Sequence, residues 1–163
     1  MRIREFQSFD VNQIIPLFYE TVHSVNAVDY SIEQLNAWAP IDELEFKLEN
    51  WRESLSNNFA YVAEINDKII GFCDMDCNGH LNRLYIHKDF QKQGIATALL
   101  HMIESKAKEM GLYKINTEAS ITAKPFFEHH GYQVINSQIV ERRNVLLINY
   151  KMIKKLVSEY PNS

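Results

Sequence analysis

The segment between Leu84 and Thr97 limits the folds open to this chain more than any other segment. It starts as an apolar strand over residues 84–86, continues through a polar turn and opens a helix at Ile95. Apolar residues of this helix recur at helical spacing, at Ile95, Ala98, Leu99, Met102, Ile103 and Met110. Another strand is expected at Tyr113–Ala119, with residues 113, 115 and 117 on one face. Strand, helix and strand in this order predict a parallel crossover within a mixed sheet.

Three helices are predicted before this segment. Asp10 is a favourable N-cap for the first helix, whose interior contains Pro16, a residue that kinks a helix or delays its start. Ser31-Ile32-Glu33-Gln34 is a capping box for a second, short helix. An acidic start at Asp42 opens the third helix, which places on one face Leu44, Leu48, Trp51 and Leu55.

A change of period follows these helices. Alternating apolar residues predict strands at Phe59–Ile65, Ile69–Met75 and His80–Ile86, which together form an antiparallel meander. Asn66-Asp67 and Asn78-Gly79 supply the turns between them. The second turn is the strongest local hairpin signal in the chain, because both of its residues tolerate positive φ.

The two ends of the chain complete the predicted fold. Met1–Phe6 is expected as a first strand, Ala123–His130 as a short helix stopped by a glycine, and Tyr132–Val140 with Val145–Met152 as a closing hairpin. The element order predicts an α/β (α+β) fold, with a mixed sheet of about seven strands flanked by about four to five helices. No repeat or Pro/Gly/Ser-rich linker interrupts the chain, so a single domain over residues 1–163 is expected.

Composition excludes several classes of function. The net charge of −4 comes without a basic stripe, so we expect neither a nucleic acid nor an anionic membrane as a partner. No apolar run approaches the ~20 residues that span a bilayer, and the N-terminus lacks the apolar core of a secretory signal. Two cysteines are too few for a disulfide framework, so a cytoplasmic protein is expected.

The two cysteines raise the question of a metal site. Cys73 and Cys77 have a spacing seen in zinc sites, and Asp74, Asp76 and His80 lie nearby. A structural zinc ion needs two more soft ligands, and no second pair of cysteine or histidine residues follows. We therefore expect no bound metal and interpret the cysteines as small strand residues.

The turn before the long helix has the features of an anion-binding site. The first N–H groups of a helix lack internal partners and together carry about half a positive charge. Gly94 and Ala96 are small enough for a phosphate to approach those groups, and Lys92 adds a full positive charge. The sequence has no Gly-Lys-Ser/Thr of a P-loop and one glycine of a dinucleotide fingerprint. By itself the turn predicts an anion at a helix N-terminus.

A resemblance to a known family makes this prediction more specific. Gln91–Ala96 resembles motif A of the GNAT acetyltransferase superfamily, Gln/Arg-x-x-Gly-x-Gly/Ala. Ser120–Phe127 followed by Gly131-Tyr132 resembles its second landmark, Asn-x-x-Ala-x-x-x-Tyr followed by Gly-Phe/Tyr, with serine and phenylalanine in place of the asparagine and tyrosine. The runs at 37–42 and 119–128 are similar to those of the YafP-like bacterial acetyltransferases, and the resemblance covers roughly residues 1–152.

The resemblance implies a GNAT fold that holds acetyl-CoA in a V-shaped gap between two parallel strands. Backbone groups at Leu84, Tyr85 and Ile86 would pair with the pantetheine arm. The pyrophosphate would lie against the turn formed by Gln91, Lys92, Gln93, Gly94, Ile95, Ala96 and Thr97. The opposite wall would be formed by Ser120, Lys124, Phe126 and Phe127, and at least one of the two phenylalanines is alternatively a core residue.

The reaction implied by the resemblance is direct attack of an amine on the thioester. Glu118 is the first candidate for general base, since it precedes Ser120 by two residues on the same strand face; its alternative is a solvated or ion-paired carboxylate. Phe127 cannot donate a proton to the leaving thiolate. Water, Tyr85 or Tyr132 would supply that proton, or the thiolate would leave unassisted. His23, Tyr30 and Trp38 are expected to shape the acceptor pocket, the alternative being that Trp38 lies in the core and His23 on the surface.

The sequence therefore predicts an N-acetyltransferase that uses acetyl-CoA as co-substrate and acts on an amine of a small molecule or peptide. One alternative is an acyl-CoA-binding sensor without turnover, which the departures at Ser120 and Phe127 keep open. Another is a protein-interaction domain that uses only the fold. A homodimer is compatible with the sequence.

Overall fold

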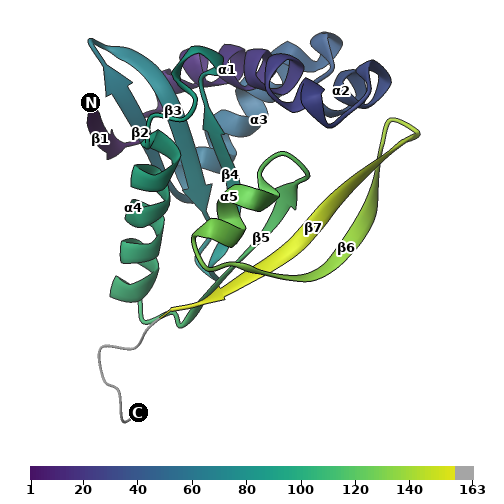
Figure 1. The fold of residues 1–163 in the computed structure, drawn as a ribbon. Coiled ribbons are helices and arrows are strands. Elements are labelled where there is room, and N and C mark those ends of the chain that lie inside the picture. Colours follow the sequence, from purple (N-terminus) through teal and green to yellow (C-terminus); the bar gives the residue numbers. More distant parts are fainter. Residues whose placement is uncertain (157–163) are drawn as a thin grey trace.

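The computed structural model describes residues 1–156 and contains one seven-stranded sheet with the strand order β1-β2-β3-β4-β5-β7-β6. The strands are β1 (Arg2–Glu5), β2 (Phe59–Ile65), β3 (Lys68–Met75), β4 (His80–Ile86), β5 (Lys114–Ser120), β6 (Gln133–Arg142) and β7 (Val145–Lys155). The helices are α1 (Val11–Ser24), α2 (Ile32–Trp38), α3 (Leu44–Asn57), α4 (Ile95–Glu109) and α5 (Lys124–His129). The mixed α/β architecture predicted from the sequence is confirmed (Figure 1).

The sheet separates two hydrophobic cores, because successive strand residues point to opposite faces. Along β2, Tyr61 and Ala63 belong to the cluster under α4, whereas Ala60 and Val62 belong to the cluster under α1 and α3. Figure 1 shows α1, α2 and α3 gathered at one end of the molecule, apart from α4. Residues on β4 and β5 therefore face either α4 or the N-terminal helices.

β4 and β5 are parallel but pair over a very short stretch. Their register joins His80 with Asn116 and Leu81 with Thr117, and no later pair follows among the described residues. The pairing of β4 with β3 also shifts between Arg83 and Leu81, which leaves Asn82 as an extra residue in a bulge. The remainder of β4 therefore diverges from β5 and opens the sheet at its centre (Figure 1).

Most helix boundaries agree with the sequence-based prediction, but two residues predicted to mark the start of α1, Asp10 and Pro16, act differently. Asp10 occupies the N-cap position of α1 without a side-chain cap bond. Its carboxylate instead accepts the N–H of Gln7 and binds Arg4. A late start at Pro16 was wrong, since α1 begins at Val11 and continues through the proline.

Other predictions from local sequence patterns were wrong, because tertiary packing determines which side chains are buried and how the turns are formed. Met102 is 37% exposed, while Leu100, outside the predicted stripe, is fully buried. Tyr113 is 75% exposed because β5 begins one residue later. Asn78 does not adopt positive φ, and Gly79 alone does so in that turn. The turn is thus longer than the two-residue hairpin that the Asn-Gly pair predicts.

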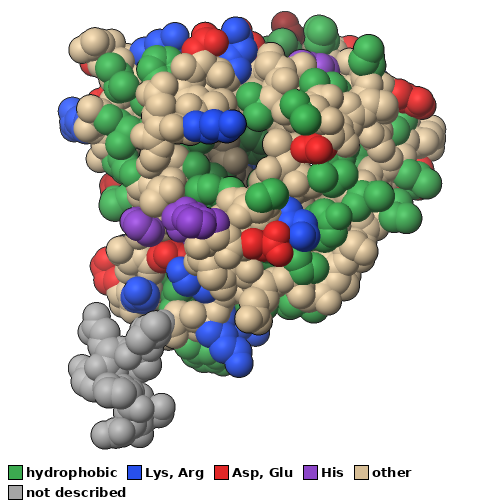
Figure 2. Space-filling view, viewed as in Figure 1, with side chains coloured by type: hydrophobic (Ala, Val, Ile, Leu, Met, Phe, Trp, Pro, Cys, Tyr) green, Lys and Arg blue, Asp and Glu red, His purple; other side chains and the backbone are tan. Residues whose placement is uncertain are grey.

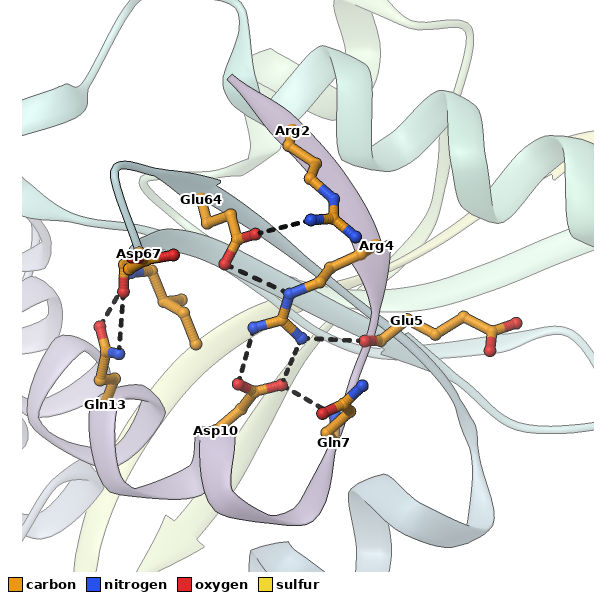
Figure 3. Close-up of polar contacts among 9 residues, drawn as sticks. Arg2, Arg4, Glu5, Gln7, Asp10, Gln13, Glu64 and Asp67 are labelled. Carbon is orange, nitrogen blue, oxygen red and sulfur yellow. Dashed lines mark hydrogen bonds and ion pairs between the residues drawn. The ribbon is translucent and has the colours of Figure 1, made fainter.

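An ion-pair network fixes β1 to the start of α1 (Figure 3). Asp10 is 1% exposed and accepts two hydrogen bonds from Arg4, at 2.8 and 2.9 Å. The Nε atom of Arg4 lies 3.2 Å from Glu64 on β2. The hydrogen bonds to Asp10 raise the pKa of Arg4 above its ordinary value. The network therefore joins three segments at the edge of the sheet.

Asp10→Asn is expected to lower the free energy of unfolding by about 3 kcal/mol, because it leaves a largely buried guanidinium without its main partner. Urea denaturation measures the change. Asp42→Asn is the matched control: Asp42 pairs with Arg143 in the same bidentate way, but at the exposed surface, so it should leave stability nearly unchanged. Equal effects of the two substitutions would contradict a structural role for the buried network.

Among residues 1–156, no helix is both long enough and apolar enough to cross a bilayer.

Candidate functional site

The first cavity lies between the end of β4, the start of α4 and the N-terminal part of α5. Its volume is about 410 Å³. Figure 2 shows this face of the molecule hollowed, with hydrophobic side chains inside the hollow. Thirteen of the fourteen residues predicted to bind acetyl-CoA line part of the wall: Leu84, Tyr85, Ile86, Gln91, Lys92, Gln93, Gly94, Ile95, Ala96, Thr97, Ser120, Phe126 and Phe127.

The turn before α4 presents free backbone N–H groups to this cavity. Lys92 and Gly94 both have positive φ, 59° and 81°, which turns the chain sharply into the helix. The first α4 hydrogen bond runs from the N–H of Ala98 to the Gly94 carbonyl. The N–H groups of residues 95, 96 and 97 precede that bond and have no partner within the helix. A Cβ atom built on Gly94 meets no atom within 4 Å, so the space in front of these groups is open.

The free edge of β4 forms one side of the cavity. Beyond the last pair with β5, residues 84–86 have no strand partner there. The Ile86 carbonyl already accepts hydrogen bonds from Thr21 Oγ1 at 2.9 Å and Gln91 Nε2 at 2.8 Å. Backbone groups of alternate residues point to the same side of a strand, and the N–H of His87 bonds to Ile70 on β3, so Tyr85 also points its backbone groups toward β3. A ligand arm along the free edge therefore has the backbone groups of Leu84 and the N–H of Ile86 as its principal partners.

The opposite wall differs in one residue from the prediction. Lys124 does not line the cavity; its ammonium binds Glu128 at 3.0 Å and lies over the Tyr150 ring. Ser120 Oγ accepts the N–H of Ala123 and so orders the start of α5. Phe126 and Phe127 line the cavity and also pack against the core beneath α4. Each of them is therefore both a wall residue and a core residue, and the two predicted alternatives are compatible.

Several lining residues had no signal in the sequence. Thr21, Val25 and Asn26 reach the cavity from the end of α1 and the turn after it, and Thr122 reaches it from the β5–α5 connection. Thr122 Oγ1 is buried and has no hydrogen-bond partner among the described residues. α1 is distant in sequence from the turn at 91–97, so only the folded chain brings these residues together.

A second cavity, of about 420 Å³, lies on the face of the sheet turned toward α2 and the β6–β7 hairpin. It contains the predicted acceptor residues Tyr30 and Trp38 and the predicted base Glu118. Tyr30 donates to the Ile148 carbonyl at 2.6 Å and accepts the N–H of Ile121, which joins the hairpin to the β5–α5 connection. His23 is not part of this cavity, since its Nε2 contacts the Ala39 carbonyl at 2.9 Å.

Tyr85 connects the two cavities. It lines both of them, together with a small third cavity of about 70 Å³ where β4 and β5 separate. Its ring packs against Phe18 and Phe72, and burial raises the pKa of its hydroxyl above the ordinary value. Tyr132 is excluded from the same role, because it is buried under α4 and donates its hydroxyl to Glu104 at 2.9 Å.

His80 is a residue of the second cavity that sequence reasoning did not assign to the site. Its Nδ1 contacts the Oδ1 of Asn116, its register partner on β5. An amide oxygen only accepts hydrogen bonds, so Nδ1 is the donor in this contact and Nε2 faces away from Asn116. Asn116 and Glu118 are two residues apart on one strand and so share a face. The sequence feature that could have placed His80 in the site is the predicted parallel pairing of β4 with β5, which brings His80 next to this face.

The two cysteines do not converge on a common site. Cys73 is buried beneath α4, while Cys77 is exposed in the turn after β3. Within the described part of the chain, no three His, Cys, Asp or Glu side chains are grouped closely enough to hold a metal ion.

Comparison with known proteins agrees with this geometry. Residues 26–154 match the family model described as Acetyltransferase (GNAT) domain. The chain is 33% identical over 152 residues to the uncharacterized N-acetyltransferase YafP of Escherichia coli, covering 93% of this chain and 94% of YafP.

Solved structures show the same fold. A GCN5-related N-acetyltransferase from Rhodopseudomonas palustris superposes with a TM-score of 0.89 at 26% identity, covering 95% of each chain. YncA from Salmonella typhimurium, whose structure holds acetyl-CoA as its cofactor, superposes with a TM-score of 0.71 at 18% identity, covering 98% of this chain and 96% of YncA. With the family model and the YafP similarity covering most of its length, this chain belongs to the GNAT family of acetyltransferases.

Proposed function

We propose that this protein transfers an acetyl group from acetyl-CoA to an amine of a small molecule or peptide. One observation carries the proposal: the cavity at the N-terminus of α4 and the cavity containing Glu118 share Tyr85 and Ser120 in their walls. A cofactor bound in the first cavity would bring its thioester to the point where β4 and β5 separate. An amine in the second cavity would approach the thioester from the other face of the sheet.

The amine must lose a proton to attack. An alkyl amine with a pKa near 10.4 is only about one part in a thousand neutral at pH 7, so a general base contributes substantially. Glu118 is exposed and lines the acceptor cavity, and we assign it as the base, acting directly or through one water. His80 lines the same cavity with a free Nε2 and is the competing candidate.

The leaving thiolate must gain a proton or depart unassisted. Phe127 lines the cofactor cavity and carries no hydroxyl. Tyr85 borders the same region, and its phenol is protonated at neutral pH and has a proton to donate. Burial raises the pKa of this hydroxyl, which makes it a weaker donor than a solvent-exposed tyrosine. We assign Tyr85 as the acid that protonates the thiolate.

Tyr85→Phe is expected to lower kcat by about 10- to 100-fold, near the lower end of general acid effects because a thiolate is a fair leaving group. The dissociation constant of acetyl-CoA should change little. Steady-state kinetics and calorimetry measure the two quantities. Tyr132→Phe serves as the matched control, since its hydroxyl is bound to Glu104 away from the site. If both variants retain wild-type kcat, Tyr85 is not the acid.

The alternative function, an acyl-CoA sensor without turnover, rests on the absence of a hydroxyl at Phe127. Release of free CoA in the presence of a panel of amines separates the two. Amine-dependent release supports the acetyltransferase, whereas tight acetyl-CoA binding with no release for any amine supports the sensor. We also propose that the protein acts in the cytoplasm, where its exposed free thiol at Cys77 stays reduced.

A further inference from the structure

The acceptor cavity has an uneven distribution of charge. Arg83 and Arg142 line it from β4 and β6, and Glu118 lines it from β5. The neutral groups between them include the Tyr30 and Trp38 rings, which stack edge to face at 5.4 Å. A molecule in this cavity therefore meets a carboxylate on β5, guanidinium groups on two other strands and an aromatic wall.

Arg83 is held rigidly in this cavity. Its Nη1 lies 2.6 Å from Oδ2 of Asp74, which is fully buried, and its Nη2 donates to Ser54 at 3.0 Å. The guanidinium also lies 4.6 Å from the centroid of the Trp51 ring. A guanidinium has five N–H donors, and these contacts use two of them. The pair with Asp74 is neutral overall, so Arg83 contributes directed donors rather than net charge.

The net positive charge comes from two neighbouring cations. Within residues 1–156, neither Lys47 nor Arg142 has a carboxylate within ion-pair distance. Lys47 lies over the same Trp51 ring as Arg83, at 5.6 Å. Burial lowers the pKa of Lys47, Glu43 opposes this change, and the charges of Arg83 and Arg142 lower it further. The three cations are thus close enough to repel one another.

The carboxylate side of the cavity has an unused hydrogen-bond acceptor. Asn149 lines the cavity from β7, and its Oδ1 is buried without a hydrogen-bond partner in the described chain. Asn149 is the register partner of Ser120, two residues from Glu118 on the same face of β5. A buried unpaired amide oxygen costs free energy, and an amine N–H group would satisfy it. Glu118 and Asn149 thus form a subsite for the amino group.

We propose that the acceptor carries an anionic oxyacid group, a carboxylate or a phosphate, in addition to the amine that is acetylated. The anion binds to Arg83 and Arg142, while the amine lies against Glu118 and Asn149. This inference rests on the proposed function, because it names the acceptor class of the same site. It also explains why unpaired cations lie beside the acceptor cavity of a protein whose net charge is negative.

A matched series of amines tests the proposal. Propylamine, β-alanine and 2-aminoethylphosphonate share a two-carbon chain from the amine and end in a methyl, a carboxylate and a phosphonate group; homologues with longer chains vary the reach. We measure kcat/KM by CoA release and, independently of turnover, dissociation constants by calorimetry on the CoA complex. The anionic amines are expected to exceed the neutral amine by about tenfold or more at the best chain length. The carboxylate and phosphonate arms decide which oxyacid is preferred.

Arg142→Gln is expected to reduce that preference to about threefold or less, mainly through KM. Arg142 is exposed and its guanidinium makes no ion pair in the described chain, so the variant should fold. Arg143→Gln is the matched control, because the adjacent arginine binds Asp42 and does not line the cavity. It should leave the preference unchanged.

The outcomes separate this inference from the proposed function. Turnover with equal kcat/KM for neutral and anionic amines would overturn the anionic acceptor and leave the acetyltransferase standing. Absence of CoA release for every amine, with a preference in calorimetry that Arg142→Gln abolishes, would overturn the proposed function and retain the anionic ligand. Equal effects of Arg142→Gln and Arg143→Gln would show that the preference reflects general surface charge, which also contradicts the inference.

Discussion

Gly94→Leu is expected to weaken acetyl-CoA binding by about 100-fold or more, equivalent to about 2.7 kcal/mol. Gly94 is the N-cap of α4, and a side chain there projects into open space beside the cavity. That space is where a pyrophosphate must lie to contact the free N–H groups of residues 95–97. A leucine side chain would hold the phosphates away from these groups and remove most of their interaction with the helix N-terminus.

The substitution also strains the backbone, and Gly111→Leu controls for that effect. Gly94 and Gly111 have φ values of 81° and 80°, and a Cβ atom at either position meets nothing within 4 Å. Each leucine therefore costs a similar amount, about 1–2 kcal/mol of stability. Gly111 follows the opposite end of α4, so its variant should bind acetyl-CoA normally. Calorimetry compares the acetyl-CoA affinities of the two variants at a temperature at which both are folded. If both variants bind acetyl-CoA with equal affinity, the pyrophosphate does not bind at the turn formed by residues 91–97.

Glu118→Gln is expected to lower kcat by about 100-fold, because glutamine retains the size of the side chain but accepts no proton. The pH dependence of kcat should change as well. Glu118 does not line the cofactor cavity, so the affinity for acetyl-CoA should stay close to the wild-type value. Steady-state kinetics over a range of pH, with calorimetry as the binding control, measure both effects.

His80→Gln provides the companion measurement, since His80 shares the acceptor cavity with Glu118. If Glu118 is the base, the His80 variant should keep the wild-type pH dependence and lose activity only modestly through altered positioning. The opposite pattern would assign proton removal to His80. In that case Glu118→Gln would keep the wild-type pH dependence of kcat, and His80→Gln would change it. Both carry ionisable groups on the same face of neighbouring strands, so only the pair of variants decides between them.

The sequence predicts the elements of this fold well because each is marked by a local signal. The capping box at Ser31–Gln34 forms as expected, with both of its hydrogen bonds. Gly111, predicted as the residue that stops the long helix, follows the C-cap of α4 in the left-handed conformation. The walls of the cavity between β4, α4 and α5 were also largely predictable, because most of its lining residues lie in the single continuous segment 84–97.

Features that depend on contacts between distant residues were not predictable. The side chain of Asp10 binds Arg4 instead of capping α1, because a guanidinium from another segment outcompetes the local N–H groups. The acceptor cavity takes its walls from α2, β4, β5, β6 and β7. Its charge pattern therefore arises only when the strands are paired in register. In the sequence His80 lies near the two cysteines, and only the pairing of β4 with β5 brings it into contact with Asn116.

The most direct test of this account is the electron density of a crystal soaked with acetyl-CoA. We predict the pyrophosphate within hydrogen-bond distance of the N–H groups of residues 95–97, the pantetheine arm along residues 84–86, and the thioester beside Tyr85 where β4 and β5 separate. Acetyl-CoA bound elsewhere, or a soaked crystal in which the cavity between β4, α4 and α5 holds no cofactor while the solution affinity is high, would contradict the assignment of this gap as the acetyl-CoA site.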